Sequence, residues 1–432
     1  MSPVTLPAAT RASLGRDRQS QIYTGALFGR RPAVPTAWAE LDRRARRRMS
    51  AGAYGYVAGG AGSESTMDAD RAAFRRWRLV PRMLRDVSVR DTSIELFGRR
   101  LPSPLLLAPI GALGIVRRDG DLAVARAAAG HGVPMIFSNQ ASVPMEQCAA
   151  AMGDAPRWFQ LYWSTSDELV ASLVGRAERS GCSAIVVTLD TTMLGWRPRD
   201  LDRGYLPFAR GDGLAQYTSD PVFRRLAAAA PAGSGPAGRP RLPELPAAVR
   251  SVARMVAATR RSPGPARALV HTFLQTYSRP SLTWSDLATL RALTSLPIVL
   301  KGIQRGDDAR RAVDAGVDGI IVSTHGGRQV AGARGALDGL PEVVAAVDGA
   351  MPVLLDSGVR GGADTLIAVA LGARAVCVGR PYALALGLAG GRGVAEHLAN
   401  LMAEFDLTLG LCGYRSVAEL DPSAVERVPG PV

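Results

Sequence analysis

Eight short apolar runs constrain the fold of this chain more than any other feature of its sequence. Each run is mostly apolar and rich in β-branched or aromatic residues. Runs of this length and composition predict strands that are buried on both faces, as in a parallel sheet. They occupy residues 105–110, 133–138, 158–163, 184–190, 297–303, 319–325, 352–357 and 375–380.

Helical stretches that end in glycine follow most of these runs. Residues 121–130, 307–316 and 363–372 have this form, and Thr165–Glu168 form a capping box that begins a helix running to Gly181. Eight βα units in succession predict a (β/α)8 barrel, the TIM barrel of the α/β class. A doubly wound sheet is the rival, but eight evenly repeated units and no Gly-x-Gly-x-x-Gly turn after the first strand count against it.

The segment before the first strand is expected to extend the barrel. Residues 1–34 are rich in arginine and proline and predict a flexible tail. Residues 35–432 are expected to form a single barrel domain. Within the N-terminal extension, residues 35–56 have a helical pattern, and residues 88–101 alternate as in a small hairpin.

An insertion at about residues 204–280 separates the fourth and fifth strands. Residues 227–246 within it are rich in alanine, proline and glycine, which predicts a loop that is mobile in part. The insertion follows the C-terminal end of a strand, where the active site of a barrel lies. It is expected to be either a lid or a disordered spacer.

Composition narrows the class of protein. The 432 residues include no run of about 18 apolar residues and no apolar secretory segment, so we expect a soluble, cytoplasmic protein without a membrane span. The four cysteines include no Cys-x-x-Cys pair, and we expect no metal site. The net charge is +14, with its densest arginine cluster at residues 43–48, but no nucleic-acid motif accompanies it, so we expect no nucleic-acid partner.

Lys301 is the only lysine among 52 basic residues. Arginine supplies every other positive charge of the side chains, so a lysine retained at one position suggests that its compact, titratable ammonium is needed there. It lies in the fifth apolar run.

Polar residues and glycines gather where the expected strands end. The C-terminal strand ends of TIM barrels carry the catalytic groups. One such residue can simply be a helix cap, so their convergence on one face of the barrel is what indicates a site. His325 is the only one of the four histidines among them. The set comprises Pro109, Ile110, Gly111, Gln160, Tyr162, Thr188, Asp190, Lys301, Ser323, His325, Arg328, Asp356, Gly358, Arg360, Gly379 and Arg380.

The last two units predict a phosphate site. Gly358, Gly361 and Gly362 expose backbone N–H groups, and Arg360 and the Gly379–Arg380 pair add further donors. The loops after the seventh and eighth strands are the usual phosphate site of this fold.

The chain resembles the FMN-dependent 2-hydroxy acid oxidases and dehydrogenases over roughly residues 35–422. The family signature Ser-Asn-His-Gly-Gly-Arg-Gln occurs at Ser323–Gln329, with Thr324 in place of asparagine. The resemblance is strongest to lactate 2-monooxygenase, through Trp196–Asp202, Asp356–Arg360 and Gly111. Further matches are Tyr54–Tyr56, Gly60–Ala61, Pro81–Leu84, Phe159–Tyr162 and Leu194–Arg197.

This resemblance implies roles for the catalytic residues. His325 would accept a proton from the substrate, and Asp190 would stabilise the imidazolium that forms. Arg328 would clamp the substrate carboxylate with the help of Tyr56 and Arg197. The remaining catalytic and cofactor roles fall to Tyr162 at the substrate hydroxyl, to Lys301 near N1 and O2 of the flavin, to Pro109, Ile110, Gly111, Ser138, Gln160, Thr188, Ser323, Asp356 and Gly358 around the flavin, and to Arg360, Gly379 and Arg380 at the phosphate.

The implied reaction is FMN-dependent oxidation of a small, lactate-like L-2-hydroxy acid to the 2-oxo acid, with oxygen or another acceptor taking the electrons. The likeness to lactate 2-monooxygenase adds oxidative decarboxylation, and the family implies a homo-oligomer, in particular a tetramer. One alternative is a tailoring oxidase that acts on a larger hydroxy acid or a peptide-derived amine. A Schiff-base aldolase using Lys301 and a basic binding protein on the same scaffold are alternatives of other classes.

Overall fold

Eight parallel strands form a closed barrel at the centre of the computed structural model, which describes residues 13–230, 242–259 and 261–428. The strands follow one another around the barrel in chain order, and β11 pairs with β4 to close it. The predicted barrel is therefore confirmed. The strands are β4 Leu105–Leu107, β5 Met135–Phe137, β6 Arg157–Leu161, β7 Ile185–Thr188, β8 Ile298–Ile303, β9 Gly319–Val322, β10 Val353–Asp356 and β11 Ala375–Val378.

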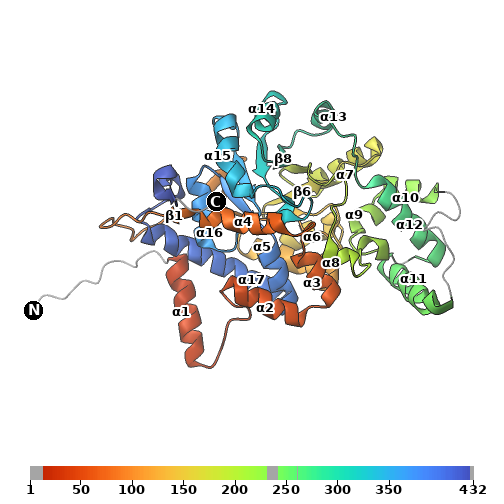
Figure 1. The fold of residues 1–432 in the computed structure, drawn as a ribbon, viewed down its shortest axis with the longest axis horizontal. Helices are drawn as coiled ribbons and strands as arrows, with labels where there is room; N and C mark the ends of the chain where they lie inside the picture. The colour runs from red at the N-terminus through yellow and green to blue at the C-terminus, as the bar shows by residue number, and fades with distance from the viewer. Residues whose placement is uncertain (1–12, 231–241, 260, 429–432) are drawn as a thin grey trace, which may run out of the picture.

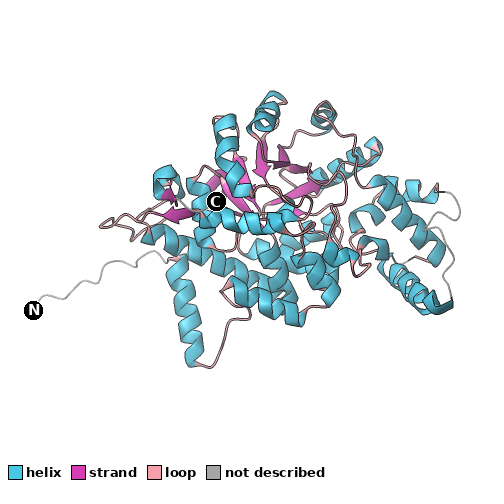
Figure 2. Cartoon of the chain, viewed as in Figure 1, coloured by secondary structure: helices cyan, strands magenta, loops and turns pink. Residues whose placement is uncertain are grey.

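Helices surround the strands and bury them on the outer face (Figures 1 and 2). Most strand residues are fully buried, which is why the runs are apolar throughout rather than alternating. The sequence predicts a helix that begins at Thr165, but the residue that caps it is Ser166. The Ser166 hydroxyl accepts the N–H of Leu169. The outer helices are α5 Gly120–Gly130, α6 Met145–Met152, α7 Asp167–Arg179, α13 Asp286–Leu293, α14 Gly306–Asp314, α15 Ala336–Val347, α16 Gly362–Ala370 and α17 Arg380–Leu411.

The N-terminal extension packs against the barrel and has the predicted helices and hairpin. Met49 and Ser50 separate α2 from α3, and the Ser50 hydroxyl caps α3 by accepting the N–H of Ala53. Strands β2 and β3 form the expected hairpin, and β1 pairs with β12 near the C-terminus. The elements are α2 Trp38–Arg48, α3 Ala51–Ala58, α4 Ser65–Arg75, β1 Trp77–Leu79, β2 Ile94–Leu96, β3 Arg99–Leu101 and β12 Val425–Arg427.

The predicted tail is wrong for the residues from Ser13 onward, which lead into a helix, α1 Leu14–Leu27, packed on α17 (Figure 1). Asp406 of α17 accepts hydrogen bonds from the Ser13 hydroxyl at 2.7 Å and from the N–H of Gly15 at 2.9 Å. A Cβ at Gly15 would lie 2.3 Å from Cγ of Leu407, so glycine permits this close approach. Residues 1–12 lie outside the described residues.

The described part of the insertion is helical, so the predicted loop is wrong there. Asp220 caps α10 by accepting the N–H groups of Val222 and Phe223, and Phe223 and Phe273 are fully buried. These contacts explain why the segment folds despite its composition. Residues 231–241 lie outside the described residues. The helices are α9 Ala215–Thr218, α10 Pro221–Ala228, α11 Leu245–Thr259 and α12 Pro263–Thr276, and a short helix, α8 Pro198–Leu201, precedes the insertion.

Among the described residues, no helix combines the length and the apolar character that crossing a membrane requires. Even α17, which has 32 residues, is not such a helix, and its backbone breaks at Ala389 and Gly390.

Candidate active site

A cavity opens at the C-terminal ends of the barrel strands, and its empty volume is about 1120 Å³ when the open solvent at its mouth is included. The strand-end residues predicted from the sequence supply much of its lining. Among the lining residues are Tyr56, Pro109, Ile110, Gly111, Tyr162, Arg197, Lys301, His325, Arg328, Asp356, Gly358, Arg360, Gly379 and Arg380.

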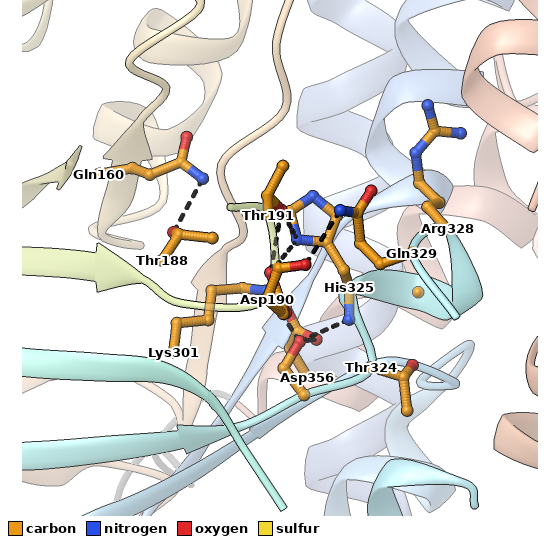
Figure 3. A network of polar contacts seen from close by, with 12 residues as sticks. Gln160, Thr188, Asp190, Thr191, Lys301, Thr324, His325, Arg328, Gln329 and Asp356 are labelled. Atoms are coloured by element: carbon orange, nitrogen blue, oxygen red, sulfur yellow. Dashed lines mark hydrogen bonds and ion pairs between the residues drawn. The ribbon is translucent and has the colours of Figure 1, made fainter. Parts of the chain in front are cut away.

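His325 and Asp190 form the central pair of the site (Figure 3). The Nδ1 atom of His325 lies 2.7 Å from Oδ1 of Asp190. Thr191, a residue that the sequence did not single out, contacts both, with its hydroxyl 3.2 Å from Nδ1 of His325 and 3.0 Å from Oδ1 of Asp190. An Nδ1–H that donates to the carboxylate leaves Nε2 of His325 unprotonated and available as a base.

Burial lowers the pKa of His325 below its ordinary value of 6.5, against the opposing influence of Asp190. For Asp190, burial alone would raise the pKa, but His325 and Lys301 lower it to about 2. The carboxylate is therefore ionised, and the imidazole is largely neutral at pH 7. A neutral imidazole oriented by an anion is the arrangement that a general base needs.

Lys301 is almost fully buried between two carboxylates. Its Nζ lies 3.1 Å from Oδ2 of Asp356 and 3.9 Å from Oδ2 of Asp190, and it donates to the Ser323 hydroxyl at 2.8 Å. Gly302, with φ of +112°, follows it, and a Cβ there would lie 3.0 Å from Cβ of Asp190. Glycine thus allows strand β8 to bring the ammonium close to Asp190.

Burial alone would lower the pKa of Lys301, but Asp356 and Asp190 raise it above its ordinary value. An amine that is held protonated cannot attack a carbonyl carbon. The ion pairs therefore favour a role as a fixed cation over the nucleophile of the Schiff-base aldolase that a lone lysine suggested. Lys301 can instead offer a fixed positive charge to an anion that develops in the cavity.

Two arginines of the cavity are held by backbone carbonyls at the end of α3. Arg328 donates through Nη1 to the carbonyl of Tyr56 and to that of Gly59, at 2.9 Å in the second case, and its guanidinium lies over the Tyr56 ring. Arg380 donates through Nε to the carbonyl of Val57 at 3.1 Å and through Nη2 to that of Gly59 at 2.8 Å. The N-terminal extension therefore places both side chains.

Arginines of the lining give the cavity a surplus of positive charge. Burial and the neighbouring Arg197 lower the pKa of Arg328 to about 9. Burial lowers the pKa of Arg360 and of Arg380 to about 10, and Arg71 and Arg360 respectively add to the effect. Guanidinium groups that are destabilised in this way favour the binding of anions beside them.

The part of the cavity that contains Arg360 fits a phosphate. Helices α16 and α17 begin beside it, after Gly361 and Gly379, and their N-terminal N–H groups favour negative charge. Nε of Arg360 is buried and has no hydrogen-bond partner among the described residues, which leaves a donor for a bound oxygen. These features are compatible with the phosphate site that the sequence predicts.

Four of the predicted cofactor residues lie just outside the lining of the cavity. Gln160 accepts from the Ser138 hydroxyl at 3.2 Å and donates to the Thr188 hydroxyl at 3.0 Å, so that these three buried side chains form a polar row from the end of β5 to β6 and β7. Figure 3 shows the contact between Gln160 and Thr188. Ser323 donates to Asp356 at 2.5 Å and lies below Lys301. These four side chains lie behind the residues that line the cavity and help to hold them in place.

An apolar wall from the loop after β7 and from the insertion completes the cavity, and the sequence reading missed its residues. Phe208 lies edge-on to Tyr56, with ring centroids 6.2 Å apart, and Phe273 stacks on Tyr277 at 5.1 Å. The composition of the insertion, which left open whether it forms a lid or a disordered spacer, did not indicate these aromatic contacts. The wall consists of Leu194, Leu206, Phe208, Phe273, Leu274 and Tyr277.

Taken together, a closed barrel, a phosphate cradle, a buried ammonium and a histidine–carboxylate pair define an enzyme that holds a phosphate-bearing cofactor over an acid–base site. A sequence profile described as FMN-dependent dehydrogenase matches residues 45–427. The chain belongs to this family of FMN-dependent 2-hydroxy acid oxidases and dehydrogenases, and its cofactor is FMN.

Known relatives agree over nearly the whole chain. An FMN-dependent alpha-hydroxy acid dehydrogenase of Penicillium citrinum is 42% identical and covers 96% of both chains. The L-lactate oxidase of Lysinibacillus sphaericus is 41% identical, over 89% of this chain and 91% of its own. A crystal structure of mandelate oxidase with (S)-4-hydroxymandelic acid is 38% identical, with a TM-score of 0.76 over 92% of this chain and all of its own.

Proposed function

We propose that this protein oxidises an L-2-hydroxy acid with an apolar side chain to the corresponding 2-oxo acid. The observation that carries the proposal is His325 paired with the Asp190 carboxylate beside a cavity that is lined with arginines. FMN, when bound, accepts the two electrons that leave the substrate. Oxygen or another acceptor then takes them up.

His325 acts as the base. Its Nε2 takes a proton from the substrate, and the adjacent Asp190 stabilises the imidazolium that results. Tyr162, whose pKa burial raises to about 12, stays protonated and can donate a hydrogen bond to the substrate hydroxyl. Lys301 supplies positive charge where the flavin becomes negative on reduction.

Arginines of the lining bind the two anions. Arg328 binds the substrate carboxylate, with Tyr56 and Arg197 beside it. Arg197 donates to the carbonyl of Arg328 at 3.2 Å and to the side chain of Gln329 at 2.6 Å, so it also fixes the loop that carries Arg328. Arg360 and Arg380 bind the FMN phosphate.

The apolar wall favours a side chain larger than the methyl group of lactate. Phe208, Phe273 and Tyr277 present aromatic surface to the space beside Tyr56. Lactate would leave most of that surface in contact with water, whereas a branched or aromatic side chain would cover it. The known mandelate oxidase complex with a hydroxymandelate is consistent with this choice.

Substrate preference provides the test. Full burial of a large apolar side chain contributes about 1.5–3 kcal/mol, so kcat/KM for 2-hydroxy-4-methylpentanoate or mandelate should exceed that for lactate by about 10- to 100-fold. Loss of the flavin absorbance under anaerobic conditions measures the reaction. Leu274→Ala, at a partly exposed position of the wall, should reduce this preference. The highest kcat/KM with lactate would disprove the proposed pocket, and no loss of absorbance with any 2-hydroxy acid would disprove the function.

The activity should follow the protonation of His325. Since the pKa of His325 lies below 6.5, the unprotonated base prevails at neutral pH, and kcat/KM should rise with pH through one ionisation below 6.5 and then level off. Asp190 raises that pKa, so Asp190→Asn should move the acid limb to lower pH and also reduce the maximal rate. An acid limb that shifts to higher pH in Asp190→Asn would contradict this pairing.

We also propose that the 2-oxo acid stays bound until it reacts with hydrogen peroxide formed from oxygen, as the resemblance to lactate 2-monooxygenase implies. Peroxide is the two-electron oxidant of this step, in which the bound 2-oxo acid and peroxide give the shorter carboxylic acid, carbon dioxide and water. Gly111 lines the cavity, with Gln140 close behind. Incubation with lactate in air should yield acetate and carbon dioxide. Free pyruvate with a full equivalent of peroxide would show instead that the enzyme is an oxidase. The tetramer implied by the resemblance and the cytoplasmic location expected from the composition are likewise proposals, and the mass of the holoenzyme in solution tests the first.

A further inference from the structure

Asp70 is a buried carboxylate for which the proposed chemistry has no use. It lies on α4, outside the barrel, and is only 2% exposed. Its Oδ1 accepts the N–H of Ala336, at the start of α15, at 3.0 Å. Its Oδ2 accepts the hydroxyl of Thr324 at 2.7 Å, and Thr324 directly precedes His325.

The turn that carries His325 needs support from outside. His325 has φ of +55°, a left-handed conformation that costs a residue with a side chain about 1 kcal/mol or more. The N–H of His325 donates to the Ser323 hydroxyl at 2.9 Å, and the N–H of Gly326 donates to the Ser357 hydroxyl, also at 2.9 Å. Both hydroxyls donate in turn to Asp356.

Thr324 provides the third hydroxyl of the turn, and its anchor is different. Its Oγ1 accepts the N–H of Gly327 at 3.1 Å while it donates to Asp70. Asp356 therefore holds the turn from inside the barrel, and Asp70 holds it from the N-terminal extension. The side chain of Thr324 is directed to Asp70 and not to the His325 ring, so threonine in place of the signature asparagine leaves the imidazole with its Asp190 partner.

We propose that Asp70 is a positioning residue for His325, acting through the Thr324 hydroxyl. A carboxylate only accepts hydrogen bonds, so it fixes the hydroxyl proton toward α4 and leaves an oxygen lone pair for the N–H of Gly327. An amide at position 70 would direct its NH2 group toward one of the two donors that now face it. The turn would then lose one of its anchors, and the imidazole would move relative to the substrate.

The test compares single and double variants of the holoenzyme. Asp70→Asn and Thr324→Val should each lower kcat by about 10- to 100-fold, with a much smaller change in KM, because misplacing a base by about 1 Å has an effect of that size. Since both changes break the same contact, Asp70→Asn should add less than about twofold in the Thr324→Val background. Thr324→Asn should recover kcat to within about threefold of the parent, because its amide can both donate to Asp70 and accept from Gly327.

Asp338→Asn is the matched control. Asp338 forms an ion pair with Arg76 between the same helices, α4 and α15, but does not contact the turn. It should leave kcat unchanged. Equal losses in Asp338→Asn and Asp70→Asn, or multiplicative effects in the double variant, would overturn the proposal. If Asp70→Asn does not fold, the comparison of Thr324→Val with Thr324→Asn decides.

A second readout does not depend on turnover, although the proposal rests on the proposed role of His325. Amide hydrogen exchange of the peptide that contains residues 324–327 should accelerate in Asp70→Asn and in Thr324→Val, and not in Asp338→Asn. Faster exchange without loss of kcat would show that the anchor exists but does not position His325, whereas failure of the role of His325 itself would appear as an unchanged rate in His325→Asn. Unchanged exchange in both variants would refute the anchor itself.

Discussion

Replacement of His325 by asparagine should slow the reduction of bound FMN by a 2-hydroxy acid by about 10²- to 10⁴-fold, the contribution expected of a general base. Asparagine is the matched choice because it tolerates the left-handed conformation that His325 adopts, with φ of +55°. The turn should therefore persist without the base. Anaerobic stopped-flow measurement of flavin absorbance gives the rate constant, and the FMN content of the purified variant should equal that of the parent.

Thr191→Val serves as the comparison for this variant. It removes the hydroxyl that contacts Nδ1 of His325 at 3.2 Å but retains the 2.7 Å contact with Asp190. Its rate should fall by less than about tenfold, because the carboxylate still orients the ring. A rate constant for His325→Asn within tenfold of the parent would show that another group removes the proton.

Replacement of Lys301 by methionine should destabilise the apoprotein by about 3–5 kcal/mol, because it leaves buried carboxylates without their partner. Asp356 is 5% exposed, and its Oδ2 lies 3.1 Å from the ammonium. Total stabilities of folded proteins are about 5–15 kcal/mol, so the loss is a large share of what is available. Urea unfolding without FMN measures it and avoids the stabilisation that cofactor binding would add.

The double variant Lys301→Met, Asp356→Asn separates charge from packing. It removes one uncompensated carboxylate and should recover part of the lost stability. No recovery would mean that the methionine is simply a poor fit. A Lys301→Met apoprotein within 1 kcal/mol of the parent would show that the ammonium does not hold the carboxylates together.

The barrel could be predicted from the sequence because its signal is local and repeated. Each strand is an apolar run that its neighbours bury on both faces, and glycine marks the helix ends. The strand ends then located most of the cavity, including His325 and Lys301. The side chains at these strand ends contact one another because the barrel closes, and the order of the apolar runs in the sequence already predicts that closure.

The remaining parts of the site depend on contacts between distant segments, which have no local signature. In the sequence, Asp70 resembles any other acidic residue of an amphipathic helix. Only its contact with Thr324 in the folded protein indicates a role for it. Phe208 and Phe273 lie in an insertion whose composition suggests a loop, but they pack against each other at 5.5 Å. The helix α1 was likewise hidden in a polar segment, because its anchor is Asp406 near the other end of the chain.

The pairing of β11 with β4 also bears on when this enzyme can acquire its cofactor. Leu107 and Val378 are register partners, although one belongs to the first strand of the barrel and the other to the last. During synthesis the ribosome must release Val378 and the Arg380 that follows before the ring can close. Every earlier nascent chain carries an open sheet with two unpaired edges, which invite association with other chains. We therefore expect flavin capture to be a late event in biogenesis, and its appearance on a nascent chain would report the completion of the ring.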